Sequence, residues 1–169
     1  VYYRPKSLPV DEQTIVMPVS EKIVVFAGSD ENTTAKNIRL ENLTIRNSDV
    51  PPNLGLGGKS SGAIHMANAE NIVVKNCRIH NTGLHGVYLT GWAQGCTVYG
   101  CEIYDIGDTG IELDGDRERS VMTCCGNRIE NNHVHDTGRN IGHGAGIQLF
   151  FAGENIISHN RVHHAPRYG

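Results

Sequence analysis

The stretch Asn71-Ile-Val-Val-Lys-Asn-Cys-Arg-Ile-His-Asn-Thr-Gly83 recurs in altered form as Gly95-Cys-Thr-Val-Tyr-Gly-Cys-Glu-Ile-Tyr-Asp-Ile-Gly107. The correspondence continues without a gap, because Gly86-Val-Tyr-Leu-Thr-Gly91 aligns with Gly110-Ile-Glu-Leu-Asp-Gly115. A repeat of about 24 residues, made of short alternating runs separated by Gly and Asn, is typical of a solenoid in which each repeat forms one coil. The sequence therefore predicts stacked coils.

Weaker copies of this repeat extend over most of the chain. One precedes the central pair, at residues 36–47, and two follow it, at residues 127–138 and 154–164. We therefore expect residues 35–169 to form the coils. Residues 1–34 are expected to form a lead-in segment and a first partial coil, with strands at residues 1–4, 14–17 and 22–26.

Three insertions interrupt the repeat. They occupy residues 48–61, 116–126 and 139–145, and each borders the third strand-like run of a coil. Insertions of this kind leave a solenoid as surface loops, and loops often carry the functional residues.

Each coil is predicted to contain three strands, whose alternate side chains point inward. Equivalent inward residues of successive coils should stack about 4.8 Å apart. The predicted columns are Leu40/Val74/Val98/Ile129/Ile157, Leu43/Cys77/Cys101/Asn132/Asn160, Ile45/Ile79/Ile103/Val134/Val162 and Ile64/Val87/Ile111/Ile147.

The columns predict an all-β fold, a right-handed parallel β-helix with three strands per coil that is part of a longer helix. A β-sandwich is the alternative, but hairpin pairs would not keep one register for a whole repeat and then repeat it. Stacked Asn132 and Asn160 are expected to satisfy each other by ladder hydrogen bonds. The bends between strands are expected at residues that tolerate left-handed backbone angles, namely Asn42, Asn76, Gly100 and Asn131.

Composition excludes several classes of protein. The 169 residues, 38% of them hydrophobic, suffice for one domain with a core, and no apolar run is long enough to span a membrane. The net charge is −3 and no basic block occurs, so no nucleic-acid partner is expected. Five cysteines cannot all pair within the chain, and Cys77, Cys96 and Cys101 are expected as small core side chains.

The outward side chains of the third strand predict a sugar-binding surface. This row of polar groups with one aromatic ring suits the hydroxyls and the apolar face of a sugar, and consists of His65, Tyr88, Glu112 and Gln148. The next outward row contains Thr90, Asp114 and Phe150. His85, Asp108 and His143 lie on the turns that lead into this strand, where they could contact a sugar or carry a proton.

Acidic residues are concentrated in one coil, at Asp105, Asp108, Glu112, Asp114 and Asp116. Glu112 and Asp114 share a strand face, so their Cα atoms should lie about 6.5 to 7 Å apart. Carboxyl groups about 5 Å apart suit a retaining glycosidase and groups about 6.5 to 9.5 Å apart an inverting one, so the spacing leaves both open. Mutual repulsion should raise one pKa and so provide an acid and a base. Alternatively, these are solvated residues, with Asp116 paired to Arg117 or Arg119.

Three histidines share the outward face of the second strand, with His135 stacked on His163 and His133 beside them. Neighbouring imidazoles form part of many zinc sites. No carboxylate or cysteine is apparent in the sequence to complete the set. We therefore predict no metal site, and favour a stacked column of surface side chains.

Four segments carry a resemblance to known proteins: residues 1–5, 105–117, 131–139 and 157–167. On these, nearly the whole chain resembles the right-handed parallel β-helix proteins that act on carbohydrates, most of all glycoside hydrolase family 141, whose members are much longer. In that family the segment matching residues 114–117 tends to read Gly-Gly-Asp-Arg. Asp116 and Arg117 match this pattern and Asp114 departs from it, so the resemblance implies roles for Asp116 in catalysis and Arg117 in substrate binding.

The resemblance implies hydrolysis of a plant cell-wall polysaccharide, either xylan or pectin side chains. Asp116 and Glu112 are the predicted acid and nucleophile or base, with Asp108 as the substitute, and no cofactor is expected. A non-catalytic carbohydrate-binding or structural β-helix is the second hypothesis. The third is a polysaccharide lyase or epimerase, which would use Ca²⁺ and a basic residue such as Arg117 or Arg119.

The remaining expectations concern location and partners. A protein that degrades polysaccharide is expected to be secreted or periplasmic, although the chain begins without a signal peptide and looks like a mature or excised piece. Its partner is expected to be a polysaccharide or oligosaccharide, with no membrane involved. Open ends of a β-helix are unpaired edges, so end-to-end self-association is expected.

Overall fold

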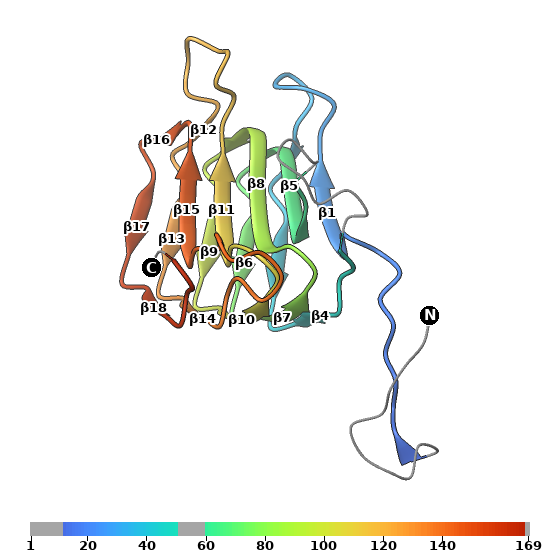
Figure 1. Ribbon diagram of the computed structural model, residues 1–169. Coiled ribbons are helices and arrows are strands. Elements are labelled where there is room, and N and C mark those ends of the chain that lie inside the picture. Colours follow the sequence, from blue (N-terminus) through green and yellow to red (C-terminus); the bar gives the residue numbers. More distant parts are fainter. Residues whose placement is uncertain (1–11, 51–59, 168–169) are drawn as a thin grey trace.

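A computed structural model describes residues 12–50 and 60–167 as parallel strands wound into successive coils (Figure 1). The first sheet contains, in spatial order, β1 (Val24–Ala27), β5 (Gly62–Glu70), β8 (His85–Gln94), β11 (Ile111–Asp114) and β15 (Ile147–Phe150). Three short strands extend it: β2 (Ala35–Lys36), β12 (Cys124–Cys125) and β16 (Ala152–Gly153).

The other two sheets complete each coil. The second contains β3 (Arg39–Glu41), β6 (Val73–Lys75), β9 (Thr97–Tyr99), β13 (Arg128–Glu130) and β17 (Ile156–Ser158). The third contains β4 (Thr44–Arg46), β7 (Arg78–Thr82), β10 (Glu102–Ile106), β14 (His133–His135) and β18 (Arg161–His163). Strands pair in parallel with their equivalents in adjacent coils, for example β9 with β6 and β13. This confirms the parallel β-helix with three strands per coil, and the β-sandwich alternative is wrong.

The observed register confirms most of the predicted core columns. Leu43 and Ile157, which are predicted in the core, are instead 48% and 39% exposed, because they belong to the end coils, which are covered by a neighbouring coil on one side only. Val74 pairs with Leu40 and Val98, Ile103 with Ile79 and Val134, and Ile111 with Val87 and Ile147. The side chains of Val74, Ile103 and Ile111 are completely buried. Burying each such side chain contributes about 1.5 to 3 kcal/mol, which accounts for the cohesion of a fold whose coils are otherwise joined by backbone hydrogen bonds. Cys77, Cys96 and Cys101 are buried free thiols, as predicted.

Asparagines of the last two coils stack on one another, with Asn127 and Asn132 buried and Asn155 and Asn160 partly exposed. Asn132 Nδ2 donates to Asn160 Oδ1 at 3.0 Å, which confirms the predicted ladder. A second ladder, not predicted from the sequence, joins Asn127 Nδ2 to Asn155 Oδ1 at 3.0 Å. These amides also bind backbone groups at the bends, so they replace hydrogen bonds that the sheets do not supply.

The bends adopt the predicted left-handed backbone. Asn42, Asn76, Gly100 and Asn131 have φ values of 58°, 51°, 63° and 56°, and His159 continues the column at 56°. Asparagine tolerates this region better than most side chains, because its short polar group bonds locally.

The N-terminal part of the chain departs from the prediction. Residues 14–17 form no strand, and β1 begins two residues later than the predicted strand at residues 22–26. The described chain before β1 extends away from the coils in Figure 1, and it returns to them at Ser20, whose carbonyl oxygen accepts from Asp49 N at 2.7 Å. The strand predicted at residues 1–4 and most of the insertion at residues 48–61 lie outside the described residues. Within the described residues, no helix is of a length and apolarity that would cross a membrane.

Loops leave the first sheet at both ends of its strands. In Figure 1 the loops of residues 28–34 and 115–123 project from the same end, and an Arg119–Glu31 ion pair joins them. The loop of residues 137–146 lies at the opposite end, where Gly138 N donates to Asp108 O at 2.8 Å. These loops border the outward face of the first sheet, where the candidate site lies.

Candidate functional site

The predicted row of polar side chains exists on the outward face of the first sheet. His65 of β5 pairs with Tyr88 of β8, Tyr88 with Glu112 of β11, and Glu112 with Gln148 of β15. Adjacent strands are about 4.8 Å apart, so neighbouring members of the row are within contact distance.

The row is far less exposed than predicted. His65, Tyr88 and Glu112 are only 6%, 4% and 5% exposed, so the open polar groove expected from the sequence is wrong for this part of the surface. The turn before β11 lies against the row, because Thr109 Oγ1 donates to Gln148 Oε1 at 3.3 Å and accepts from Ala145 N at 3.3 Å. Strand alternation predicts which side of the sheet a residue occupies, but not what covers it.

His85 brings two carboxyl groups together. Its Nδ1 lies 3.6 Å from Oε2 of Glu112 and 4.0 Å from Oδ2 of Asp108. The same nitrogen accepts a hydrogen bond of 3.4 Å from Thr109 N, and the ring stacks on Tyr88 with centroids 5.3 Å apart. The two carboxyls therefore face a single imidazole that is held by the backbone and by an aromatic ring.

Asp114 is held by Tyr88. The Tyr88 hydroxyl donates to Oδ2 of Asp114 at 2.7 Å, and burial together with this hydrogen bond raises the pKa of Tyr88. Tyr88 is thus a neutral donor that fixes the Asp114 carboxylate next to Glu112. Asp114 therefore lies beside the predicted row, and its role in substrate binding stays a prediction.

Glu112 and Asp108 differ in environment and so in acidity. Burial, with smaller contributions from Asp108 and Asp114, raises the pKa of Glu112 to about 8. Burial also raises the pKa of Asp108, but hydrogen bonding from Thr109 and the charge of His143 counteract it. Asp108 is more open, with 18% of its side chain exposed against 7% for Glu112. The pair therefore offers a protonated carboxyl beside a more solvated one, as an acid and a base require.

The site contains neutral histidines. Burial lowers the pKa of His85 and of His65 to about 4, with a further lowering of His65 by Lys22. His65 Nδ1 is buried without a hydrogen-bond partner among the described residues. Since both imidazoles are uncharged at neutral pH, neither neutralises the nearby carboxyls.

These histidines predict a loss of stability in acid. The unfolded chain binds protons at ordinary histidine pKa values near 6.5, whereas the folded state binds them only near pH 4, so the free energy of unfolding should fall between these values. His65→Gln should reduce this loss, measured by urea unfolding at pH 7 and pH 5, whereas Asn140→Ala, which removes no titratable group, should not. Glu112 has the opposite effect, because its raised pKa lowers the free energy of unfolding as pH rises from 4.5 to about 8. Both variants retain Glu112, so this effect cancels when their free energies are compared at the same pH. Equal losses in both variants would contradict this prediction.

Two predicted catalytic or binding residues lie elsewhere. Asp116 is exposed in the loop after β11, where its carboxylate accepts from Glu118 N at 2.9 Å and lies 3.6 Å from Nε of Arg119. Arg117 lies with its guanidinium 5.9 Å from the ring centroid of Phe151. The structure gives Asp116 no contact with Glu112 or Asp108, so the expected pair of Asp116 and Glu112 is not brought together. The bond to Arg119 matches the alternative that Asp116 is a solvated loop residue.

The remaining acidic and polar candidates divide in the same way. The group of Glu112, Asp108, His85, Tyr88 and Asp114 is called the Glu112 cluster below. Two further predicted residues lie at it, because exposed His143 acts on Asp108 through its charge and Gln148 binds Thr109. Asp105 instead forms an ion pair of 2.8 Å with Arg139. Thr109 is a site residue that the sequence analysis missed. The sequence shows only that Thr109 lies between Asp108 and the strand. It does not show that the backbone nitrogen of Thr109 binds His85 and that its hydroxyl binds Gln148.

Comparison with known proteins extends these observations. A family model described as "Right handed beta helix region" matches residues 22–169. A solved structure described as "Glycoside hydrolase" is 18% identical, with a TM-score of 0.76 over 89% of this chain and 33% of that chain. The A-module of the Azotobacter vinelandii mannuronan C-5 epimerase AlgE4 is 17% identical, with a TM-score of 0.57 over 88% of this chain and 41% of that module. The chain thus spans less than half of either structure, and the likeness concerns the fold. No curated protein sequence matches the chain.

Proposed function

The chain belongs to the family of right-handed β-helix proteins, as predicted, and on this premise we propose that it hydrolyses a glycosidic bond through the carboxyl pair Glu112 and Asp108. The observation that carries the proposal is their shared contact with His85, in environments that favour a proton on Glu112. The pair replaces the predicted combination of Glu112 with Asp116.

In this proposal Glu112 is the general acid. Its protonated carboxyl donates to the glycosidic oxygen, and the leaving sugar departs with that proton. Asp114, fixed by Tyr88, keeps negative charge beside Glu112 and so helps to keep Glu112 protonated. Both are positioned by strand pairing, which holds their backbones in register.

Asp108 is the ionised partner. It either removes a proton from a water molecule that attacks the anomeric carbon, or attacks that carbon itself to form an ester that water later cleaves. Either route consumes one water molecule per bond and regenerates both carboxyls. Neutral His85 lies next to both groups without adding a charge, and its Nδ1, which accepts from Thr109 N, donates no proton to either carboxyl.

The proposed substrate is a plant-type cell-wall polysaccharide, with xylan and pectin side chains as first choices from the family 141 resemblance. Exposed His143 and partly buried Gln148 would bind hydroxyls. Phe150, which pairs with Asp114 and is 44% exposed, offers an apolar surface for a sugar ring. Such a substrate lies outside the cell, so secretion or periplasmic residence belongs to the same proposal.

A panel of xylans and pectins tests the proposal. We expect reducing ends to appear with hydrolysis products that have gained water, and Asp108→Asn to abolish their release while retaining binding. Binding to the panel without release would favour the carbohydrate-binding hypothesis and overturn the enzymatic one. Products with an ultraviolet-absorbing double bond, formed only with Ca²⁺, would instead identify a lyase.

A further inference from the structure

A second cluster of chemical groups lies on the outward face of the third sheet. Glu102, His133 and His135 each offer one ligand atom, and these atoms all lie within 4.8 Å of one another. Register explains the juxtaposition, because Glu102 of β10 pairs with His133 of β14, and His135 follows two residues later on the same face. The sequence-based expectation that no carboxylate completes the histidine set is therefore wrong. Its signal was present, since the alignment of Ile103 with Val134 places Glu102 beside His133.

His135 has the environment of a metal ligand. Its Nδ1 lies 2.8 Å from Oδ2 of Asp136, whose other oxygen accepts from Arg139 at 3.0 Å. A proton on Nδ1 leaves a lone pair on Nε2, and this atom is buried without a hydrogen-bond partner among the described residues. Metal-binding histidines commonly donate their second ring nitrogen to a carboxylate in this way. An unpartnered buried nitrogen otherwise costs free energy.

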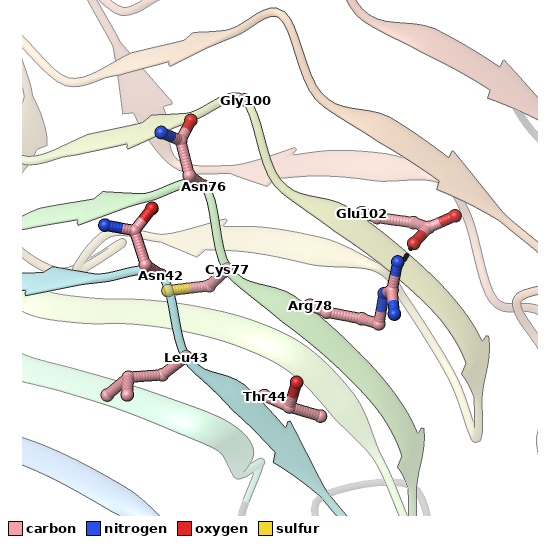
Figure 2. Close-up of a pocket in the computed structure, with 8 residues that line it drawn as sticks. All are labelled: Asn42, Leu43, Thr44, Asn76, Cys77, Arg78, Gly100 and Glu102. Carbon is pink, nitrogen blue, oxygen red and sulfur yellow. Dashed lines mark hydrogen bonds and ion pairs between the residues drawn. The ribbon is translucent and has the colours of Figure 1, made fainter.

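Glu102 is oriented by an ion pair and keeps ligand capacity. Figure 2 shows Arg78 directed at Glu102, and Nε of Arg78 donates to Oε2 at 2.8 Å. A carboxylate has two oxygens, so Oε1 can bind another group. The Glu102 side chain is 40% exposed, so an ion can reach its carboxylate from solvent.

Ring stacking accounts for only part of this arrangement. His80, Tyr104, His135 and His163 form a column with ring centroids 4.8 to 5.3 Å apart and nearly parallel planes. Stacking alone does not explain why His135 binds Asp136, or why ligand atoms of Glu102 and His133 lie within 4.8 Å of a ligand atom of His135. His133 contacts His163 through Nε2 at 2.8 Å and has a second ring nitrogen.

We propose that Glu102, His133 and His135 bind a divalent transition-metal ion such as Zn²⁺, which links β10 to β14. Two imidazoles and one carboxylate suit such ions, whereas Ca²⁺ and Mg²⁺ prefer oxygen ligands alone. His163 or water supplies a further ligand. The site is separate from the Glu112 cluster and stabilises the stacking of adjacent coils.

Metal binding by the full chain, without a histidine tag and after chelation, tests this proposal. Calorimetric titration at pH 7.5 should show one equivalent of Zn²⁺ bound and no response to Ca²⁺. His135→Ala should abolish binding, and Asp136→Asn should weaken it about 10- to 100-fold, because Asp136 only orients the ligand. His80→Ala removes a ring from the same column and should leave binding unchanged.

The wild-type chain provides a second readout in case a variant fails to fold. Zn²⁺ should protect His133, but not His80, from modification by diethyl pyrocarbonate, as mapped by mass spectrometry, whereas His135 is shielded with or without the ion. Bound Zn²⁺ should also raise the melting temperature, reversibly on chelation. Absence of stoichiometric binding, or equal loss in His80→Ala and His135→Ala, would overturn the proposal.

Discussion

Replacing Glu112 with Gln is expected to lower kcat for glycoside hydrolysis by about 10²- to 10⁴-fold, the usual contribution of a general acid. Gln keeps the volume of the side chain but has no carboxyl proton to give to the leaving oxygen. The measurement is reducing-sugar release on the best substrate of the panel, with substrate affinity measured separately. KM should change little, because the proton is transferred only in the transition state and the lost interaction is absent from the bound ground state.

The pH profile of the wild type should report the same group. Because burial raises the pKa of Glu112 to about 8, the acid remains protonated at neutral pH, and activity should fall as pH rises through about 8. Activity should also fall in acid, when Asp108 becomes protonated, at a pH above the ordinary aspartate range because its pKa is raised. In Glu112→Gln the residual activity should no longer fall as pH rises through about 8, because the group that loses its proton there is absent.

Asp116→Asn is the matched control for this prediction. Asp116 is the catalytic residue favoured by the family resemblance, yet it lies in the loop and binds Glu118 N and Arg119. We expect Asp116→Asn to retain most activity. If Asp116→Asn removed activity and Glu112→Gln did not, the proposed acid would be wrong and the family pattern would be the better guide.

Replacing Asn132 with Ala should reduce the free energy of unfolding by about 3 kcal/mol, because buried polar groups lose their partners. The Asn132 side chain accepts from Cys101 N at 2.9 Å and donates to Val98 O and Asn160 Oδ1, both at 3.0 Å. Asn132 is 2% exposed, so water cannot readily replace these bonds. Urea unfolding followed by circular dichroism measures the loss.

Asn140→Ala provides the comparison for the asparagine ladder. Asn140 is exposed, and its Nδ2 makes one bond of 2.9 Å to Gly83 O, so its loss should cost about 1 kcal/mol or less. Similar losses in the two variants would show that the buried ladder contributes no more than a surface amide. A larger loss in Asn132→Ala would show that the interior bends depend on it.

Much of the fold could be predicted because its periodicity is visible in side-chain type. The pairing of Ile79 with Ile103, and of Tyr88 with Glu112, follows from one constant offset between repeats. The bends at Asn76 and Gly100 were predictable because few residues adopt positive φ readily. By contrast, residues 14–17 resemble a strand in composition but lie where no neighbouring strand pairs with them.

The sequence by itself determined the three strands per coil, the core columns and the row from His65 to Gln148, because parallel pairing preserves register from one coil to the next. Only the tertiary structure decided that Glu112 is buried, and that Asp108 rather than Asp116 joins it at His85. The physical reason is that insertions follow no period. The path of a loop and the direction of a long side chain depend on local hydrogen bonds and packing, which repeat spacing does not encode.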